Sequence, residues 1–145
     1  MQNIIAMNPE EFKKRTKAFA VRIINLVDRL PNSRATNAIA NQLVRSGMSV
    51  GANYRAACRA KSRADFISKL GTVEEESDET LYWMELLVES GKMKAAALSG
   101  LMREAGEILA MTVASINTAR SGRNPQSATP INREHATKVG VRNPR

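Results

Sequence analysis

Apolar residues recur at alternating spacings of four and three along the first part of the chain, beginning at Phe12. This alternation is typical of a helix that buries one face against neighbouring helices. Asn8 precedes Pro9 and stands three residues before Glu11, a combination that favours a helix start. Pro31 favours a helix end. We therefore predict a first helix over residues 8–30, with a buried stripe of Phe12, Thr16, Phe19, Ile23, Leu26 and Leu30.

Three further segments show the same alternation, and the third opens on a capping-box pattern of Ser62 and Asp65 and stops at Gly91. Four helices joined by short connections predict an all-α, antiparallel up-down-up-down four-helix bundle. The second stripe is Ile39, Leu43, Ser46, Val50, Asn53 or Tyr54, and Ala57. The third is Phe66, Leu70, Val73, Ser77, Leu81, Met84 and Val88, and the fourth is Leu98, Leu101, Ala105, Ile108, Thr112 and Ser115 or Ile116.

Small residues crowd the middle of the second segment, where Gly47 and Gly51 lie one turn apart. A glycine inside a helix costs roughly 1 kcal/mol relative to alanine. We expect a neighbouring backbone to approach closely there, the alternative being that the helix simply tolerates the weakness.

The periodicity ends after Arg120, so we place the bundle in residues 1–120 and a disordered basic tail in residues 121–145. The tail has five basic residues, one acid and too few large apolar residues to offset its ordering entropy. The chain shows neither a signal-peptide pattern nor a run of 18 apolar residues. We expect a cytoplasmic protein with no membrane partner.

Charge is segregated along a chain whose formal net charge is +8, which favours an anionic partner such as nucleic acid. Four cations cluster between the second and third helices, and residues 70–90 contain seven carboxylates and no base. The cations that we expect to contact nucleic acid are Arg55, Arg59, Lys61, Arg63 and Lys69, with Lys13, Lys14 and Lys17 of the first helix. The alternative is that they form ion pairs with the acidic third helix.

The third helix contains an unusual run in which seven of eight residues, from 81 to 88, are apolar or aromatic. One helix face cannot hold them all, so part of the run should meet another subunit. The expected oligomer interface comprises Tyr82, Trp83, Leu86 and Ile24. Alternatively, Tyr82 and Trp83 lie partly buried along the edge of their own domain.

Side-chain sets that support catalysis are missing from the sequence, so we predict no enzyme activity, no cofactor and no metal site. The single histidine, His135, lies in the tail, which excludes a Glu-x-x-His di-metal bundle and leaves Cys58 without a histidine base on any helix. Gly47 and Gly51 follow no strand and lack the lysine of a phosphate-binding loop. The cluster from Glu74 to Glu79 fits a solvated acidic face better than a cation site.

The segment from residue 42 to residue 79 resembles the 23S rRNA intervening-sequence protein family of small bacterial four-helix bundle proteins. The resemblance rests on Gln42-Leu43, Arg45-Ser46, Ser49-Val50, Ala52-Asn53, Lys61-Ser62, Asp65-Phe66, Leu70 and Glu79, without a gap. It implies a ring, typically a homopentamer, with a basic surface for nucleic acid and no known catalytic activity. The accessory proteins of diversity-generating retroelements, which partner a reverse transcriptase, are similar.

Two positions depart from the family pattern: Ala56 stands where a Glu is frequent and Ala57 where a Gly is frequent. If that carboxylate balances the basic turn in other members, its absence leaves Arg55 and Arg59 less neutralised here, a hypothesis that favours anion binding.

Charge and resemblance together predict a non-enzymatic, ring-forming protein that binds RNA or DNA, with the tail adding sequence-independent affinity. The alternative is an adaptor whose positive face docks a partner protein such as a reverse transcriptase.

Overall fold

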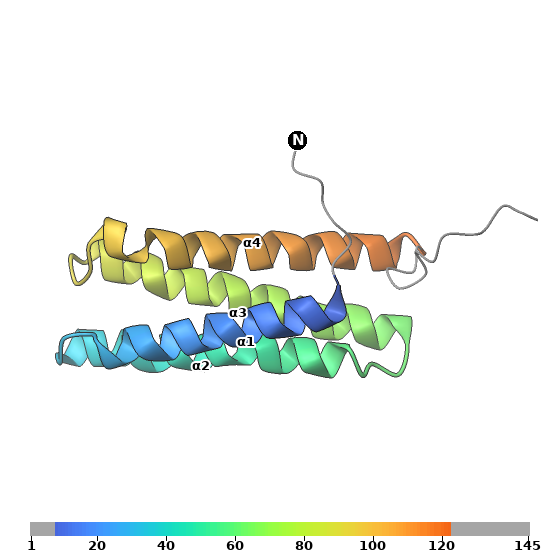
Figure 1. Ribbon diagram of the computed structural model, residues 1–145, viewed down its shortest axis with the longest axis horizontal. Helices are drawn as coiled ribbons and strands as arrows, with labels where there is room; N and C mark the ends of the chain where they lie inside the picture. Colours follow the sequence, from blue (N-terminus) through green and yellow to red (C-terminus); the bar gives the residue numbers. More distant parts are fainter. Residues whose placement is uncertain (1–7, 123–145) are drawn as a thin grey trace, which may run out of the picture.

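The computed structural model describes residues 8–122, which form four α-helices and no strand (Figure 1). They are α1 (Pro9–Asp28), α2 (Arg34–Ala57), α3 (Arg63–Glu89) and α4 (Ala95–Arg120). The all-α, four-helix prediction is confirmed. The predicted tail, from residue 123 onward, and His135 lie outside the described residues.

Each of the first three helices starts at a side chain that accepts hydrogen bonds from the backbone N–H groups of the first turn. Asn8 accepts from Glu10 and Glu11, Ser33 accepts from Thr36, and Ser62 accepts from Asp65. These N–H groups have no partner within the helix, so the caps stabilise the starts that the sequence indicates. Beyond the end of α3, Gly91 has a φ of 73°, a conformation that glycine adopts at little cost.

Each helix packs beside the next one along the chain, and short connections join them at the two ends of the bundle (Figure 1). This packing is consistent with the expected up-down-up-down order. α1 and α4 are also neighbours, although they meet at fewer places than the sequential pairs. Arg15 bridges this seam, with its Nε 2.5 Å from Glu104 Oε1 and its Nη2 2.5 Å from Glu107 Oε2.

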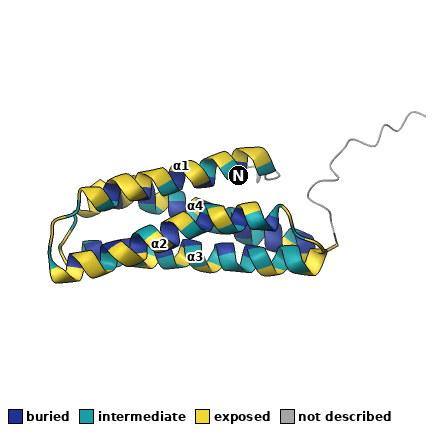
Figure 2. Cartoon of the chain, turned by 90° about the horizontal axis from the view of Figure 1, so that it is seen from below, coloured by how far each residue is buried: buried dark blue, intermediate teal, exposed yellow. Residues whose placement is uncertain are grey.

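The core lies along the bundle axis, on the inward sides of all four helices (Figure 2). The first stripe is buried as predicted from Phe12 to Leu26, and Leu30 is half-buried. The structure selects Tyr54 rather than Asn53, and buries both Ser115 and Ile116. Small hydroxyl groups inside the core form hydrogen bonds with one another, as where Thr80 Oγ1 of α3 donates to Ser46 Oγ of α2 at 2.9 Å.

The close approach expected at the two glycines of α2 is present. A Cβ added to Gly47 would lie 2.9 Å from Cγ2 of Ile23, and one added to Gly51 would lie 3.2 Å from Oγ1 of Thr16. Both neighbours belong to α1, and both are fully buried. The missing side chains therefore allow α1 to lie close against α2.

Candidate nucleic-acid interface

Positive side chains from three helices and one turn gather at the end of the bundle where α2 ends and α3 begins. α1 also begins at this end, and α4 finishes there (Figure 1). All of these cations are exposed, and no ion pair joins any of them to a carboxylate of residues 8–122. We call this set the basic end: Arg55, Arg59, Lys61, Arg63 and Arg120.

The turn that carries the basic end is fixed by Asp65. Its Oδ2 accepts the backbone N–H of Lys61 at 3.0 Å, and its Oδ1 is 2.5 Å from Nζ of Lys69. The Lys69 ammonium and the Lys61 N–H both stabilise the carboxylate, so they lower the pKa of Asp65 below its usual value. Asp65 therefore stays ionised near neutral pH and holds the turn in place.

The remaining predicted cations differ in their surroundings. Lys69 is bound to Asp65, and Lys13 lies 3.1 Å from Glu10, so both are partly neutralised within the subunit. Lys14 and Lys17 are exposed and have no ion pair with a described carboxylate. The structure thus brings four of the predicted cations together at the turn and leaves Lys14 and Lys17 on the outer face of α1.

Arg120 is a member of the basic end that sequence reasoning did not select. The chain just beyond the end of α4 reaches the start of α3, since a Cβ added to Gly122 would lie 3.7 Å from Nη1 of Arg63. The order of the helices could have indicated this position of Arg120, because in an up-down-up-down bundle the fourth helix ends where the third begins.

Tyr54 precedes the basic turn in sequence, but it does not face solvent. It is 2% exposed, and its ring meets Phe12 edge to face with a centroid separation of 4.5 Å. It is therefore unavailable to stack on unpaired bases.

The Tyr54→Phe variant is expected to lose less folding stability at alkaline pH than the unaltered protein does. Burial, with a smaller effect of the neighbouring Cys58, raises the pKa of Tyr54 above its ordinary value. Above about pH 10 the unfolded chain releases this proton while the folded chain keeps it, so stability falls by up to about 1.4 kcal/mol per pH unit. Urea unfolding from pH 8 to pH 11 measures the slope, and equal slopes for the two proteins would contradict this assignment.

The acidic helix α3 forms ion pairs with one cation of α2. Arg45 lies 3.2 Å from Oε2 of Glu76 and also pairs with Glu79. The predicted alternative of ion pairing with α3 thus applies to Arg45, and to none of the residues of the basic end within the described chain.

The four residues predicted for an oligomer interface differ in exposure. Tyr82 is 50% exposed and Ile24 is 38% exposed, whereas Trp83 and Leu86 are half-buried. Trp83 packs against the core of its own subunit, and its indole N–H donates to Oε1 of Glu79 at 3.1 Å. Trp83 therefore matches the alternative of a domain-edge residue, while Tyr82 and Ile24 face outward.

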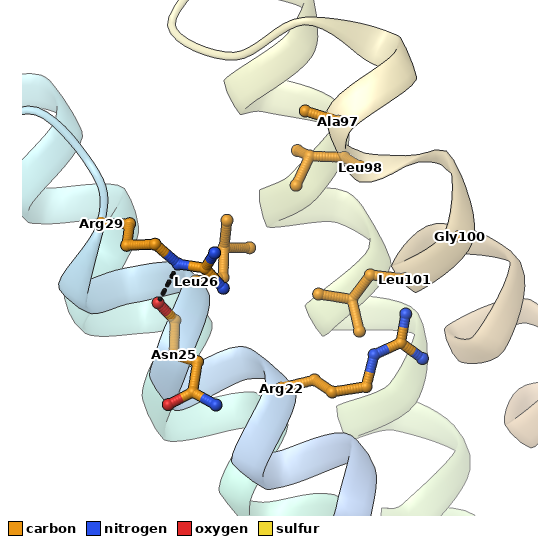
Figure 3. Close-up of a pocket in the computed structure, with 8 residues that line it drawn as sticks. All are labelled: Arg22, Asn25, Leu26, Arg29, Ala97, Leu98, Gly100 and Leu101. Atoms are coloured by element: carbon orange, nitrogen blue, oxygen red, sulfur yellow. Dashed lines mark hydrogen bonds between the residues drawn. The ribbon is translucent and has the colours of Figure 1, made fainter.

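A small groove of about 210 Å³ lies between α1 and α4 at the opposite end of the bundle (Figure 3). Leu26, Leu98 and Leu101 contribute apolar side chains to it, and Arg22 and Arg29 contribute guanidinium groups. Arg29 Nε donates to the carbonyl oxygen of Asn25 at 3.1 Å. The groove is open to solvent and lacks the nucleophile and base that acyl transfer would need.

Residues 8–122 also lack the features of two other kinds of site. No group of three or more His, Cys, Asp or Glu side chains is arranged to hold a metal ion there. In the same part of the chain, no helix has the length and apolar character to span a membrane.

Comparison with known proteins identifies the family. A model of the 23S rRNA-intervening sequence protein family matches residues 10–114. The chain belongs to this family. The match spans α1 to α3 and most of α4, so the family sequence pattern covers nearly the whole bundle, including four of the five residues of the basic end.

A solved structure of a related protein has the same fold as this member of the 23S rRNA-intervening sequence protein family. It is the 1.70 Å crystal structure of a protein of unknown function from the S23 ribosomal protein family of Bacteroides thetaiotaomicron VPI-5482. The two chains share 38% identity with a TM-score of 0.72, and the match covers 77% of this chain and 100% of that one. No functionally curated protein matches the chain.

Proposed function

We propose that this protein is a non-enzymatic nucleic-acid-binding protein that holds RNA or DNA phosphates at its basic end. The observation that carries the proposal is the convergence of five exposed cations from α2, α3, α4 and one turn, with no ion pair to a described carboxylate. The description of the family, which names an intervening sequence of 23S rRNA, makes RNA the first ligand to test.

Recognition at such a surface rests on charge and shape. Lys and Arg bind phosphates without reading bases, and the ring of Tyr54, which stands beside Arg55, is buried. If five cations contact phosphates, counterion release predicts that affinity falls roughly 500-fold between about 50 and 200 mM salt. A steep salt dependence with little sequence preference is therefore the expected signature.

We also propose that the protein acts as a homo-oligomeric ring in the cytoplasm. The outward-facing Tyr82 and Ile24 support self-association, because exposed apolar side chains at a protein surface favour contact with another subunit. Five subunits is the number that the family resemblance implies.

Fluorescence anisotropy with a labelled RNA hairpin and a matched DNA duplex tests the nucleic-acid proposal. We expect tight, salt-dependent binding by the full chain and by a form ending at Arg120. The match to the related crystal structure covers all of that chain but only 77% of this one. A shortened form of this protein is therefore expected to fold.

The other outcomes are equally informative. Binding that disappears on truncation would move the site to residues 121–145. Absence of binding by both forms would contradict the proposal and favour the adaptor function, in which the basic end docks a protein such as a reverse transcriptase.

A further inference from the structure

The exposed residues of α3 between residues 74 and 89 form one stripe with a regular spacing of three and four. Four of its five members are carboxylates, and the fifth is the half-exposed Tyr82. None of these carboxylates forms an ion pair with a described residue. We call it the α3 stripe: Glu75, Asp78, Tyr82, Glu85 and Glu89.

The ring of Tyr82 has an aromatic neighbour within its own subunit. It packs edge to face on Trp83, with a centroid separation of 5.0 Å, and the indole N–H of Trp83 donates to Glu79. An exposed aromatic ring that is flanked by charged groups is the kind of anchor that protein interfaces use.

The outer face of α1 carries a stripe with the same spacing and the opposite charge. We call it the α1 stripe: Lys14, Lys17, Val21 and Ile24. All four residues are exposed, and Val21 and Ile24 are two of the four large apolar side chains that are exposed in the described chain, at 50% and 38%. If Val21 of one copy is aligned with Tyr82 of another, Lys14 and Lys17 lie opposite carboxylates of the α3 stripe. This holds for both the parallel and the antiparallel orientation of the two helices.

These two stripes cannot meet within one subunit. α1 packs on α2 and α4, and α3 packs on the same two helices, so α1 and α3 stand diagonally across the bundle and do not pack against each other. Both stripes consist of exposed residues. A second copy of this chain is therefore the partner that offers each stripe its complement.

We infer that the α1 stripe of one copy binds the α3 stripe of the next, an inference that rests on the self-association proposed above and specifies the faces that make it. Because different faces meet, the contact is heterologous and generates either a closed ring or an open filament. A helix of 20 residues is about 30 Å long and 10 Å wide, so one contact covers less than about 800 Å² per partner. Ring closure, which gives every copy two contacts, would stabilise the assembly.

Two lysines that were predicted to contact nucleic acid belong instead to the contact between subunits. Lys14 and Lys17 lie in the α1 stripe, where the carboxylates of a neighbouring subunit occupy them. The basic end does not include these residues, so assembly and nucleic-acid binding use separate parts of the subunit.

Charge reversal with rescue tests this contact in the full-length protein. The variants are Lys14→Glu with Lys17→Glu on α1, replacement of all four carboxylates of the α3 stripe by Lys, and both sets of changes in one chain. Light scattering after gel filtration should give an oligomer for the unaltered protein, the 15.9 kDa monomer for each single-stripe variant, and an oligomer again for the variant with both stripes reversed. The exposed pair Arg34→Glu with Lys92→Glu matches the charge change of the α1 variant and should leave the mass unaltered.

Circular dichroism verifies that each variant is helical. Retention of the full mass by either single-stripe variant, or a folded variant with both stripes reversed that stays monomeric, would overturn the pairing of these two stripes. A monomeric unaltered protein would overturn the self-association itself. Anisotropy with the RNA hairpin gives an independent readout of the basic end in each case.

Discussion

Reversing the charge of four residues of the basic end, Arg55, Arg59, Lys61 and Arg63, to Glu is expected to weaken binding of an RNA hairpin roughly 1,000-fold at about 100 mM salt. Each phosphate contact contributes close to one released counterion, so the slope of log affinity against log salt should fall by about four. The four side chains are exposed, and none forms an ion pair with a described residue, so the fold should tolerate the change. Anisotropy titrations over a salt series measure both quantities.

A matched variant distinguishes the effect of the basic end on binding from the effect of the net charge of the protein. Arg34, Lys92, Lys94 and Arg103 are also exposed and lie away from the basic end, and reversing all four changes the net charge by the same amount. We expect this variant to bind only a few-fold more weakly than the unaltered protein. Equal losses for the two variants would show that net charge, and not the basic end, determines binding.

Replacing Gly47 by Val is expected to destabilise the protein by about 3 kcal/mol, because the core has no room for the added side chain. An added Cβ would already lie 2.9 Å from Cγ2 and 3.0 Å from Cγ1 of Ile23, which is fully buried. Thermal unfolding should show a decrease in Tm of roughly 12 °C for a domain of this size.

Gly71→Val is the matched control, since an added Cβ there would meet nothing within 4 Å. Its stability should stay within about 1 kcal/mol of the unaltered protein, because valine differs little from glycine in helix propensity. Combining Gly47→Val with Ile23→Ala should recover part of the loss. If Gly47→Val unfolds at the same temperature as Gly71→Val, the contact between α1 and α2 is looser than described.

The four helices could be predicted from the amino-acid sequence, because the signals that form a helix are local. A stripe with helical spacing must face the core to be buried, and Asn8, Ser33, Ser62 and Gly91 mark the ends through hydrogen bonds and backbone conformations within one turn. The two glycines in the middle of α2 indicated that a neighbouring helix approaches closely. The sequence could not show that the residues in contact are Ile23 and Thr16 of α1.

Which charges remain free of ion pairs could not be predicted from the sequence, because an ion pair between helices depends on how the helices are packed. The packing joins Lys69 to Asp65 and Arg45 to α3, brings Arg120 to the basic end and buries Tyr54. It also places the α1 and α3 stripes on diagonal helices, so that the two stripes do not meet within residues 8–122. Periodicity shows which face of a helix points outward, but the neighbour of that face is fixed only when distant segments come together.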